Sequence, residues 1–386
     1  MAGRERLSVR TVVGRKAART IPMTRKVGII STYNIPCGIA EHTKYFAEQL
    51  KSPCAIFAEN HPTPIYPDNP CVTRCWTRDF NDYKPLLDNI IRQGVNIVDI
   101  QFEFSFYHNT DNLLKLLSLL RARNVKTVIT FHTIVNFMAN CINTLGDTCD
   151  GIIATSPTMM RPEWLRPSVR RKMRFIPLAV PVPSDQDRHA LRQKYGITSN
   201  HIVATFGFLV GHKGIVQVVE QIYEVKKYIP DIKYLIIGCH EGQPHGTYYN
   251  QIVETVNRLE LQNNVIFYDK FYPIGELLEL LHLSDLIVMN YYVAHQTASG
   301  AAKIALASHR PVLGSDSMMF DDIPHDVMQR TPMGDSNEMG RYIRSLLGDS
   351  GKRASMENKG YQFVQSISAE KVAHLHDEYY MQIRGY

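Results

Sequence analysis

The feature that most constrains this chain is a regular alternation of short apolar segments with amphipathic helical ones. The alternation begins with the apolar run VGIIS at 27–31 and continues to about residue 180. A proline-rich stretch at 177–183, PLAVPVP, interrupts it, and the same pattern starts again at residue 201. Short apolar strands separated by helices are typical of parallel sheets that are covered on both faces. The chain is therefore predicted to be an α/β protein with two doubly wound, Rossmann-like domains.

The predicted elements form two sets, one on each side of the proline-rich stretch. The first set has strands at 27–31, 54–58, 96–103, 126–132, 151–156 and 174–180, and helices at 39–51, 84–94, 112–123 and 157–172. The second has strands at 201–207, 232–238, 265–270, 286–291 and 311–315, and helices at 215–228, 247–260, 274–283, 299–308 and within 337–384. The predicted domain bounds are 26–180 and 181–360, with a C-terminal helix at 361–386 that packs across both. Ligands of such sheets bind outside the carboxyl ends of the strands, so two facing domains predict a cleft that contains the site.

The net charge of +6 is concentrated at the N-terminus. Residues 1–26 contain eight basic residues and one acidic residue, so they carry +7 and the rest of the chain carries −1. The favoured interpretation of 1–25 is a basic, disordered tail, or a stretch upstream of the true start. An arm that binds a polyanion such as DNA is the alternative.

Cysteine usage and hydropathy indicate the compartment. The seven cysteines are odd in number and irregular in spacing, which argues against a disulfide framework and for a reducing environment. No apolar run of about 18 residues and no secretory signal is evident, so no transmembrane segment is predicted and the protein is expected to be cytoplasmic.

The first candidate site is the segment that follows the strand predicted at 201–207. The strand ends at Gly207, Phe208 follows, and Lys213-Gly214 opens the next helix. Glycines allow backbone amides to approach a ligand, a helix N-terminus favours anions, and a lysine adds a point charge. The segment therefore predicts a diphosphate site, with a tight βα turn and a solvated lysine as the alternative.

The second candidate site follows the strand predicted at 286–291. A polar loop leads to Ser299-Gly300-Ala301, which begins an alanine-rich helix. Small residues at a helix start leave the first N–H groups accessible, and the helix dipole favours phosphate there. An ordinary serine N-cap is the alternative.

These two sites, together with two further segments, resemble the GT-B glycosyltransferases of the large retaining family (glycosyltransferase family 4-like). The resemblance lies in four segments in this order: 36–41, 131–133, 207–215 and 285–312. It covers roughly residues 26–330. It implies an acceptor-side N-terminal domain, a C-terminal domain that binds the nucleotide sugar, and metal-independent transfer of a hexosyl or pentosyl group from a nucleotide-diphosphate sugar to a hydroxyl acceptor. The nucleotide sugar is a co-substrate, and no bound cofactor or metal is implied.

The resemblance also implies roles for individual residues. The expected catalytic residues are Glu41, Glu103, His132, Lys213 and Gln296. The expected donor-binding residues are Gly38, Gly207, Phe208, Lys213, Gly238, Phe271, Gln296, Thr297, Ser299, Gly300 and Ala301. Lys213 and the amides that open the second helix would neutralise the diphosphate, and His132 would lie near the transferred sugar. Residues that follow or close strands of the first domain, including His42 and Gln101, could line the acceptor side.

The sequence departs from the family pattern at three positions. Phe208 stands where the family often has an arginine, and Gln296 and Ile304 stand where it usually has two glutamates. An amide can still bind a sugar hydroxyl, but Ile304 cannot bind a ribose through a hydrogen bond. No metal site of the Asp-x-Asp type is expected, and Asp321-Asp322 is interpreted as a solvated loop rather than a metal or hydrolytic pair.

Three other functions remain as alternatives to general glycosyl transfer. One is sugar transfer to a hydroxylated base in DNA, with the basic residues 1–26 holding phosphates. Another is a non-catalytic module that binds a sugar nucleotide or a glycan. A nucleotide-dependent oxidoreductase is disfavoured, because no Gly-x-Gly-x-x-Gly follows the first strand.

Overall fold

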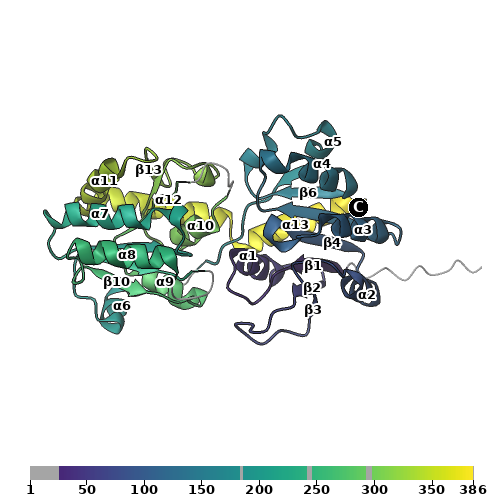
Figure 1. The fold of residues 1–386 in the computed structure, drawn as a ribbon, viewed down its shortest axis with the longest axis horizontal. Helices are drawn as coiled ribbons and strands as arrows, with labels where there is room; N and C mark the ends of the chain where they lie inside the picture. Colours follow the sequence, from purple (N-terminus) through teal and green to yellow (C-terminus); the bar gives the residue numbers. More distant parts are fainter. Residues whose placement is uncertain (1–25, 183–185, 241–245, 293–297, 386) are drawn as a thin grey trace, which may run out of the picture.

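The computed structural model describes residues 26–182, 186–240, 246–292 and 298–385 of the chain. The basic tail at 1–25 and two predicted site residues, Gln296 and Thr297, lie outside the described residues. The described chain forms two α/β lobes, with the first part of the sequence in one and the middle part in the other (Figure 1). Each lobe is built on a parallel sheet, as the sequence predicts.

The N-terminal sheet has the strand order β3-β2-β1-β4-β5-β6-β7, and every neighbouring pair is parallel. Its strands are β1 (Val27–Ser31), β2 (Cys54–Glu59), β3 (Val72–Trp76), β4 (Ile97–Phe102), β5 (Lys126–Phe131), β6 (Gly151–Ala154) and β7 (Met173–Phe175). The helices of this lobe are α1 (Gly38–Ala47), α2 (Lys84–Arg92), α3 (Thr110–Arg121), α4 (Ala139–Thr148) and α5 (Pro167–Arg170). The central strands β1 and β4 are fully buried, which explains their near-continuous apolar sequences.

The C-terminal sheet has the order β10-β9-β8-β11-β12-β13, again all parallel. Its strands are β8 (Ile202–Phe206), β9 (Lys233–Ile237), β10 (Val265–Tyr268), β11 (Leu286–Met289), β12 (Val312–Ser315) and β13 (Gln329–Thr331). The helices are α6 (Arg188–Tyr195), α7 (Ile215–Lys226), α8 (Thr247–Arg258), α9 (Ile274–His282), α10 (Gly300–Ala307), α11 (Ser336–Gly348) and α12 (Ser350–Ser366). In both sheets the strand order reverses beside the first strand, β1 or β8, so a crevice forms at its carboxyl end.

Several elements differ from the sequence prediction. The helix predicted at 157–172 is wrong: only a short 3-10 turn, η3 (Pro157–Met160), and α5 form there. Pro162 and Pro167 lie inside the predicted span, and proline interrupts a helix by removing an N–H donor and clashing with the preceding turn. The edge strand β3, helices α4 and α6 and the edge strand β13 were not predicted. The sequence of β3, VTRCW, is only partly buried and lacks a clear apolar run.

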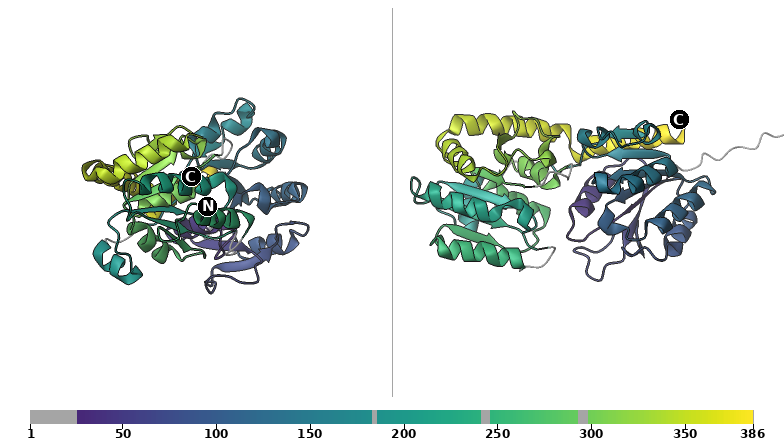
Figure 2. Two further views of the ribbon diagram at one scale, coloured as in Figure 1. Left: turned by 60° about the vertical axis from the view of Figure 1, so that its left-hand side comes forward. Right: turned by 45° about the horizontal axis from the view of Figure 1, so that its top comes forward.

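The last two helices belong to different lobes. Helix α12 packs against α10 of the C-terminal lobe, whereas α13 (Ala369–Arg384) packs against α1 of the N-terminal lobe. Figure 2 shows α13, in yellow, lying along the N-terminal lobe. The Tyr380 hydroxyl donates to the fully buried Asp99 of β4 at 2.6 Å, and the Tyr379 hydroxyl donates to the Lys172 carbonyl at 2.6 Å. The chain therefore crosses between the lobes twice, and the two crossings meet in a parallel bridge between Val180 and Ser368.

Two further observations concern the whole described chain. All seven cysteines are free thiols, as expected from their number and spacing. Among the helices of the described residues, none has the length and apolarity needed to cross a membrane.

Candidate active site

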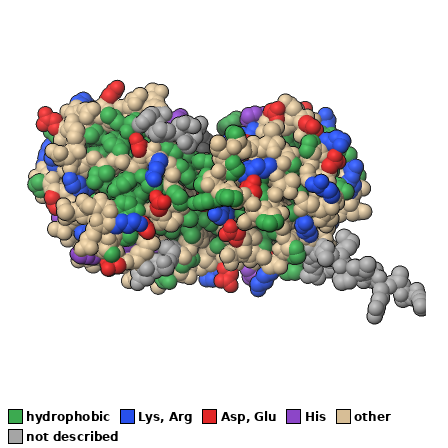
Figure 3. All heavy atoms as spheres, turned by 90° about the horizontal axis from the view of Figure 1, so that it is seen from below, with side chains coloured by type: hydrophobic (Ala, Val, Ile, Leu, Met, Phe, Trp, Pro, Cys, Tyr) green, Lys and Arg blue, Asp and Glu red, His purple; other side chains and the backbone are tan. Residues whose placement is uncertain are grey.

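A pocket of about 570 Å³ lies between the two lobes, where the carboxyl ends of β1 and β8 face each other. The space-filling view shows the molecule narrowing between the lobes, with hydrophobic side chains reaching across (Figure 3). The pocket is lined by these predicted site residues: Gly38, Glu41, Glu103 and His132 from the N-terminal lobe, and Gly207, Phe208, Lys213, Gly238, Phe271, Gly300 and Ala301 from the C-terminal lobe. The tertiary structure thus brings together residues that are up to 263 positions apart in the sequence, from Gly38 to Ala301.

Lys213 lies at the end of a short 3-10 turn, η4 (Gly211–Lys213), that follows β8. Its side chain is almost fully buried, with 8% of the residue exposed, so the predicted alternative of a solvated lysine is wrong. The ammonium lies 5.2 Å from the ring centre of Tyr291, and no described carboxylate forms an ion pair with it. Because burial disfavours the charged form, the pKa of Lys213 is lowered to about 8. An unpaired buried ammonium is costly, and an anionic ligand would offset that cost.

Two glycines allow the backbone to pass close to this lysine. Gly207 has φ +121°, and a Cβ there would overlap the Lys213 ammonium. Gly238 has φ +145°, and a Cβ there would overlap the carbonyl oxygen of Gly207. Both positions favour glycine because L-residues with a side chain rarely adopt these φ values, and Gly238 also requires it for steric reasons, since its contact is with backbone.

The second candidate site is the N-terminus of α10. Ser299 is the N-cap, and its hydroxyl accepts a hydrogen bond from the Ala302 amide at 3.1 Å. The side chain of Ser299 therefore has the ordinary capping role, while Gly300 and Ala301 line the pocket. The first N–H groups of a helix have no intrahelical acceptor, so this end of α10 presents partial positive charge to the pocket.

A buried ion pair holds α10 in place. Lys303, in the second turn of α10, pairs with Asp322, and their side chains are 0% and 1% exposed. The interpretation of Asp321-Asp322 as a solvated loop is therefore wrong for Asp322. Within the described residues, no group of three or more His, Cys, Asp or Glu side chains is arranged to hold a metal ion.

The N-terminal lobe contributes two carboxylates to the pocket. Glu41, in the first turn of α1, accepts a hydrogen bond from the Tyr45 hydroxyl at 2.8 Å. Glu103 follows β4 and accepts from the Phe104 amide at 3.0 Å and from the Thr133 hydroxyl at 2.7 Å. Burial is the largest effect on both carboxyls and raises the pKa of each above its usual value.

Two histidines lie beside these carboxylates. His132 donates from Nε2 to the Gln101 side-chain oxygen at 2.9 Å, because that oxygen can only accept. Burial lowers the pKa of His132 to about 4, so the ring is neutral at physiological pH and Nδ1 carries a lone pair. His42 accepts from the Ala179 amide at 3.0 Å, and burial lowers its pKa as well. Neither ring carries positive charge into the pocket.

The C-terminal wall of the pocket also contains residues that were not predicted. Lys270 follows β10 and lies in the wall, with its ammonium 4.6 Å from the ring centre of Tyr272. The sequence analysis assigned Lys270 to the strand predicted at 265–270 and not to a loop at the site. The observed strand ends at Tyr268, so Lys270 belongs to the loop that follows it. Lys270 supplies a second cation to a wall in which Phe208 occupies the position where the family often has an arginine.

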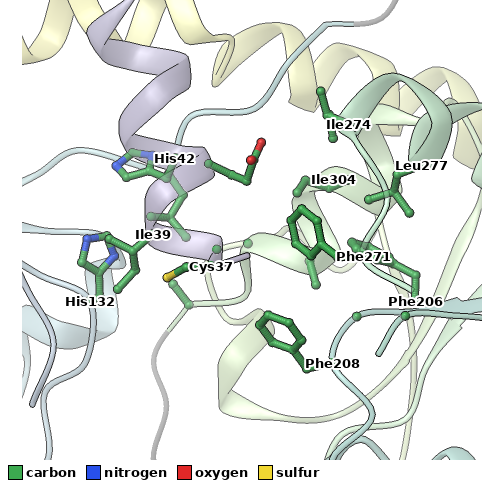
Figure 4. Close-up of a pocket in the computed structure, with 18 of the residues that line it drawn as sticks. Cys37, Ile39, His42, His132, Phe206, Phe208, Phe271, Ile274, Leu277 and Ile304 are labelled. Carbon is green, nitrogen blue, oxygen red and sulfur yellow. The ribbon is translucent and has the colours of Figure 1, made fainter. Parts of the chain in front are cut away.

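The rest of the C-terminal wall is largely apolar. Figure 4 shows His42 and His132 on one side of the pocket and, on the other, the hydrophobic side chains of Phe206, Phe271, Ile274, Leu277 and Ile304. A flat apolar body such as a nucleobase would bury its surface against such a wall.

Residues 187–363 match the protein family described as glycosyl transferases group 1. This stretch contains Lys213, both glycines and the N-terminus of α10. No curated protein sequence matches the chain closely enough to count as a relative.

Solved structures of similar fold cover both lobes of the chain. HepE from Anabaena in complex with UDP has a TM-score of 0.70 at 15% identity, covering 92% of this chain and 98% of that one. A glycosyltransferase from Rickettsia africae has a TM-score of 0.71 at 15% identity, covering 94% and 99%. A sucrose-phosphate synthase from Thermosynechococcus elongatus has a TM-score of 0.71 at 17% identity, covering 93% and 99%. The predicted GT-B fold is thereby confirmed over nearly the whole chain.

Proposed function

We propose that this protein is a glycosyltransferase that moves a sugar from a nucleotide-diphosphate donor to a hydroxyl acceptor bound on the N-terminal wall. The observation that carries the proposal is the buried Lys213 ammonium, which has no ion-pair partner among the described residues and shares a pocket with the N-terminus of α10. Both groups favour an anion, and a diphosphate that leaves during sugar transfer develops negative charge at this place. Preorganised positive groups of this kind stabilise a transition state because they need no rearrangement.

The proposed reaction exchanges one bond at the anomeric carbon for another. The bond from this carbon to the distal phosphate oxygen breaks, and the acceptor hydroxyl oxygen forms the new bond. In the retaining mechanism implied by the family resemblance, the leaving phosphate takes the acceptor proton on the same face of the sugar. Lys213, Gly300 and Ala301 hold the leaving group, and the neutral His132 orients a sugar or acceptor hydroxyl through Nδ1. We propose that this reaction is independent of a metal ion.

The donor is best sought among uridine nucleotides. The Anabaena protein with the same fold has been solved with UDP and with UDP-glucose, which makes these two compounds the first probes. Phe271, Tyr272 and Ile304 line the pocket; in this proposal the two aromatic rings frame the base, and Ile304 gives the ribose an apolar neighbour instead of a carboxylate. The free cysteines support our proposal of a reducing, cytoplasmic location.

The test of the function combines nucleotide binding with turnover. UDP binding is measured by calorimetry, and transfer or hydrolysis of UDP-glucose and related nucleotide sugars is measured by release of the free nucleotide diphosphate. Binding with turnover is the expected result. Binding without turnover for any donor would favour the alternative of a non-catalytic sugar-nucleotide module, and the absence of both would refute the proposal.

The affinity for UDP is expected to fall as the pH rises above 8. The lowered pKa of Lys213, about 8, means that the free protein loses this positive charge above that pH. Since the diphosphate stabilises the ammonium, binding at pH 9 requires proton uptake, and the dissociation constant should rise about tenfold between pH 7 and pH 9. Calorimetry at both pH values measures the change. Lys213→Ala should bind weakly and show no such dependence, and an unchanged affinity of the natural protein would contradict the assignment.

A further inference from the structure

The charges on the two walls of the pocket have opposite signs. Among the described residues that line the pocket, both lysines, Lys213 and Lys270, come from the C-terminal lobe. The two carboxylates among these described lining residues, Glu41 and Glu103, come from the N-terminal lobe. The donor diphosphate therefore has a cationic wall, while whatever binds against the N-terminal lobe meets an anionic one.

The two carboxylates lack an ion-pair partner in the described part of the chain. No described lysine, arginine or histidine forms an ion pair with Glu41 or Glu103, and the hydrogen bonds they accept come from neutral groups. Lys44, one turn along α1, lies near enough for its charge to lower the pKa of Glu41, but it forms no ion pair with this carboxylate, and its ammonium stacks over the ring of Tyr66 at 4.7 Å. Glu41 and Glu103 are half-buried, and a carboxylate that loses part of its hydration gains from a cationic partner, so these two leave a place for positive charge in the ligand.

The other polar groups of the N-terminal wall do not change its sign. His42 and His132 are held neutral by burial, which lowers the pKa of both rings. Tyr45 and Thr133 are neutral donors that already point to the carboxylates. A phosphate or carboxylate on an acceptor bound against this wall would thus face two like charges, which is unfavourable in a partly desolvated pocket.

We infer that the acceptor is a hydroxyl compound that carries a protonated amine, and that phosphorylated acceptors are rejected. The inference rests on the proposed function, because it assigns the N-terminal wall to the acceptor. The amine would pair with Glu103 or Glu41, and the hydroxyls would pair with the remaining carboxylate oxygens and with Nδ1 of His132. The same charges disfavour DNA as the acceptor, since its phosphates would approach this wall.

Three matched sugars test the inference on the full chain saturated with UDP at about pH 7. Glucosamine, glucose and glucose 6-phosphate differ at one substituent each, and their binding is measured by calorimetry or by saturation-transfer NMR. We expect glucosamine to bind about tenfold more tightly than glucose, and glucose 6-phosphate to bind at least tenfold more weakly than glucose. Glucosamine that binds no better than glucose, glucose 6-phosphate that binds as well as glucose, or no measurable glucosamine binding would each overturn the inference.

Variants identify the groups responsible. Glu103→Gln and Glu41→Gln keep the size of the side chain and remove its charge, so each should reduce the preference for glucosamine over glucose several-fold and improve binding of glucose 6-phosphate. Glu163→Gln, at an exposed position outside the pocket, is the matched control and should leave the order unchanged. If neither Glu103→Gln nor Glu41→Gln changes the relative affinities for the three sugars, the inference is also overturned. UDP binding is measured in the same samples, so a failure of the donor site, and with it of the proposed function, is seen separately from a wrong order of acceptors.

Discussion

Lys213→Ala is expected to weaken UDP binding about 100-fold and to lower turnover by a factor of about 100 to 1,000. The ammonium is buried, unpaired among the described residues, and adjacent to the glycines that let a ligand approach. Removal of one partner of a desolvated charge pair typically costs about 2–5 kcal/mol in binding, and loss of one preorganised donor to the leaving charge lowers a rate by similar factors. Calorimetry with UDP and a nucleotide-release assay measure the two effects.

The same substitution should leave the free protein as stable as before, or make it more stable. The natural protein buries an ammonium for which the described part of the chain supplies no carboxylate partner, and the alanine variant removes that desolvation cost. Lys227→Ala is the matched control, since Lys227 is an exposed lysine that pairs with Glu224 within one turn, and it should bind UDP normally. A Lys213→Ala variant that melts at an unchanged temperature and still binds UDP with full affinity would refute the phosphate site.

Gly238→Ala is expected to be the most damaging single substitution at the site. Its φ of +145° is unfavourable for alanine, and the added Cβ would overlap the Gly207 carbonyl oxygen. This contact is with backbone, so relief requires β8 and β9 to move apart beside Lys213. We expect a cost of about 3 kcal/mol, which lowers the melting temperature of a domain of this size by about 6 to 12 °C, and a loss of UDP binding.

Gly275→Ala provides the control for this prediction. Gly275 lies in the first turn of α9, and a Cβ there would meet no atom within 4 Å. Alanine is the better helix former, so the melting temperature should stay the same or rise slightly, and UDP binding should be unchanged. If Gly238→Ala has the same melting temperature and the same UDP affinity as Gly275→Ala, the close approach of Gly238 to Gly207 is not needed for stability or for UDP binding.

Most of the fold was predictable because the central strands are buried on both faces. The sequence 27–31 and the run 286–289 are uninterrupted apolar segments, and the structure places them as β1 and β11 inside covered sheets. The edge strand β3 could not be predicted in this way, because its residues are only partly buried and need no apolar pattern. The helix predicted at 157–172 does not form as one element, because Pro162 and Pro167 interrupt a segment whose other residues favour a helix.

The site was predictable where backbone geometry requires a residue type, and not where a side chain is recruited from elsewhere. Gly207 and Gly238 have φ values that favour glycine, and a glycine at the end of a predicted strand can be recognised in the sequence. Lys270 cannot be recognised in this way, since a lysine after a strand is ordinarily solvated, and only the approach of the loop after β10 brings it to the pocket wall. Asp322 is a second example. Two adjacent acidic residues predict a solvated loop, but the tertiary structure buries Asp322 in an ion pair with Lys303.

The sequence by itself determined the two parallel-sheet domains and the presence of a positively charged turn after β8. The hydrophobic periodicity, the positions of glycines and the residues that begin helices are all local properties of the chain. Only the tertiary structure decided that Lys213 is buried without an ion-pair partner among the described residues, and that the described charged residues on the two walls of the pocket have opposite signs. Burial and charge pairing depend on which distant segments pack together, and here those segments come from two lobes that the chain crosses twice. No local pattern contains that information, because the electrostatic environment of a side chain is set by its neighbours in space.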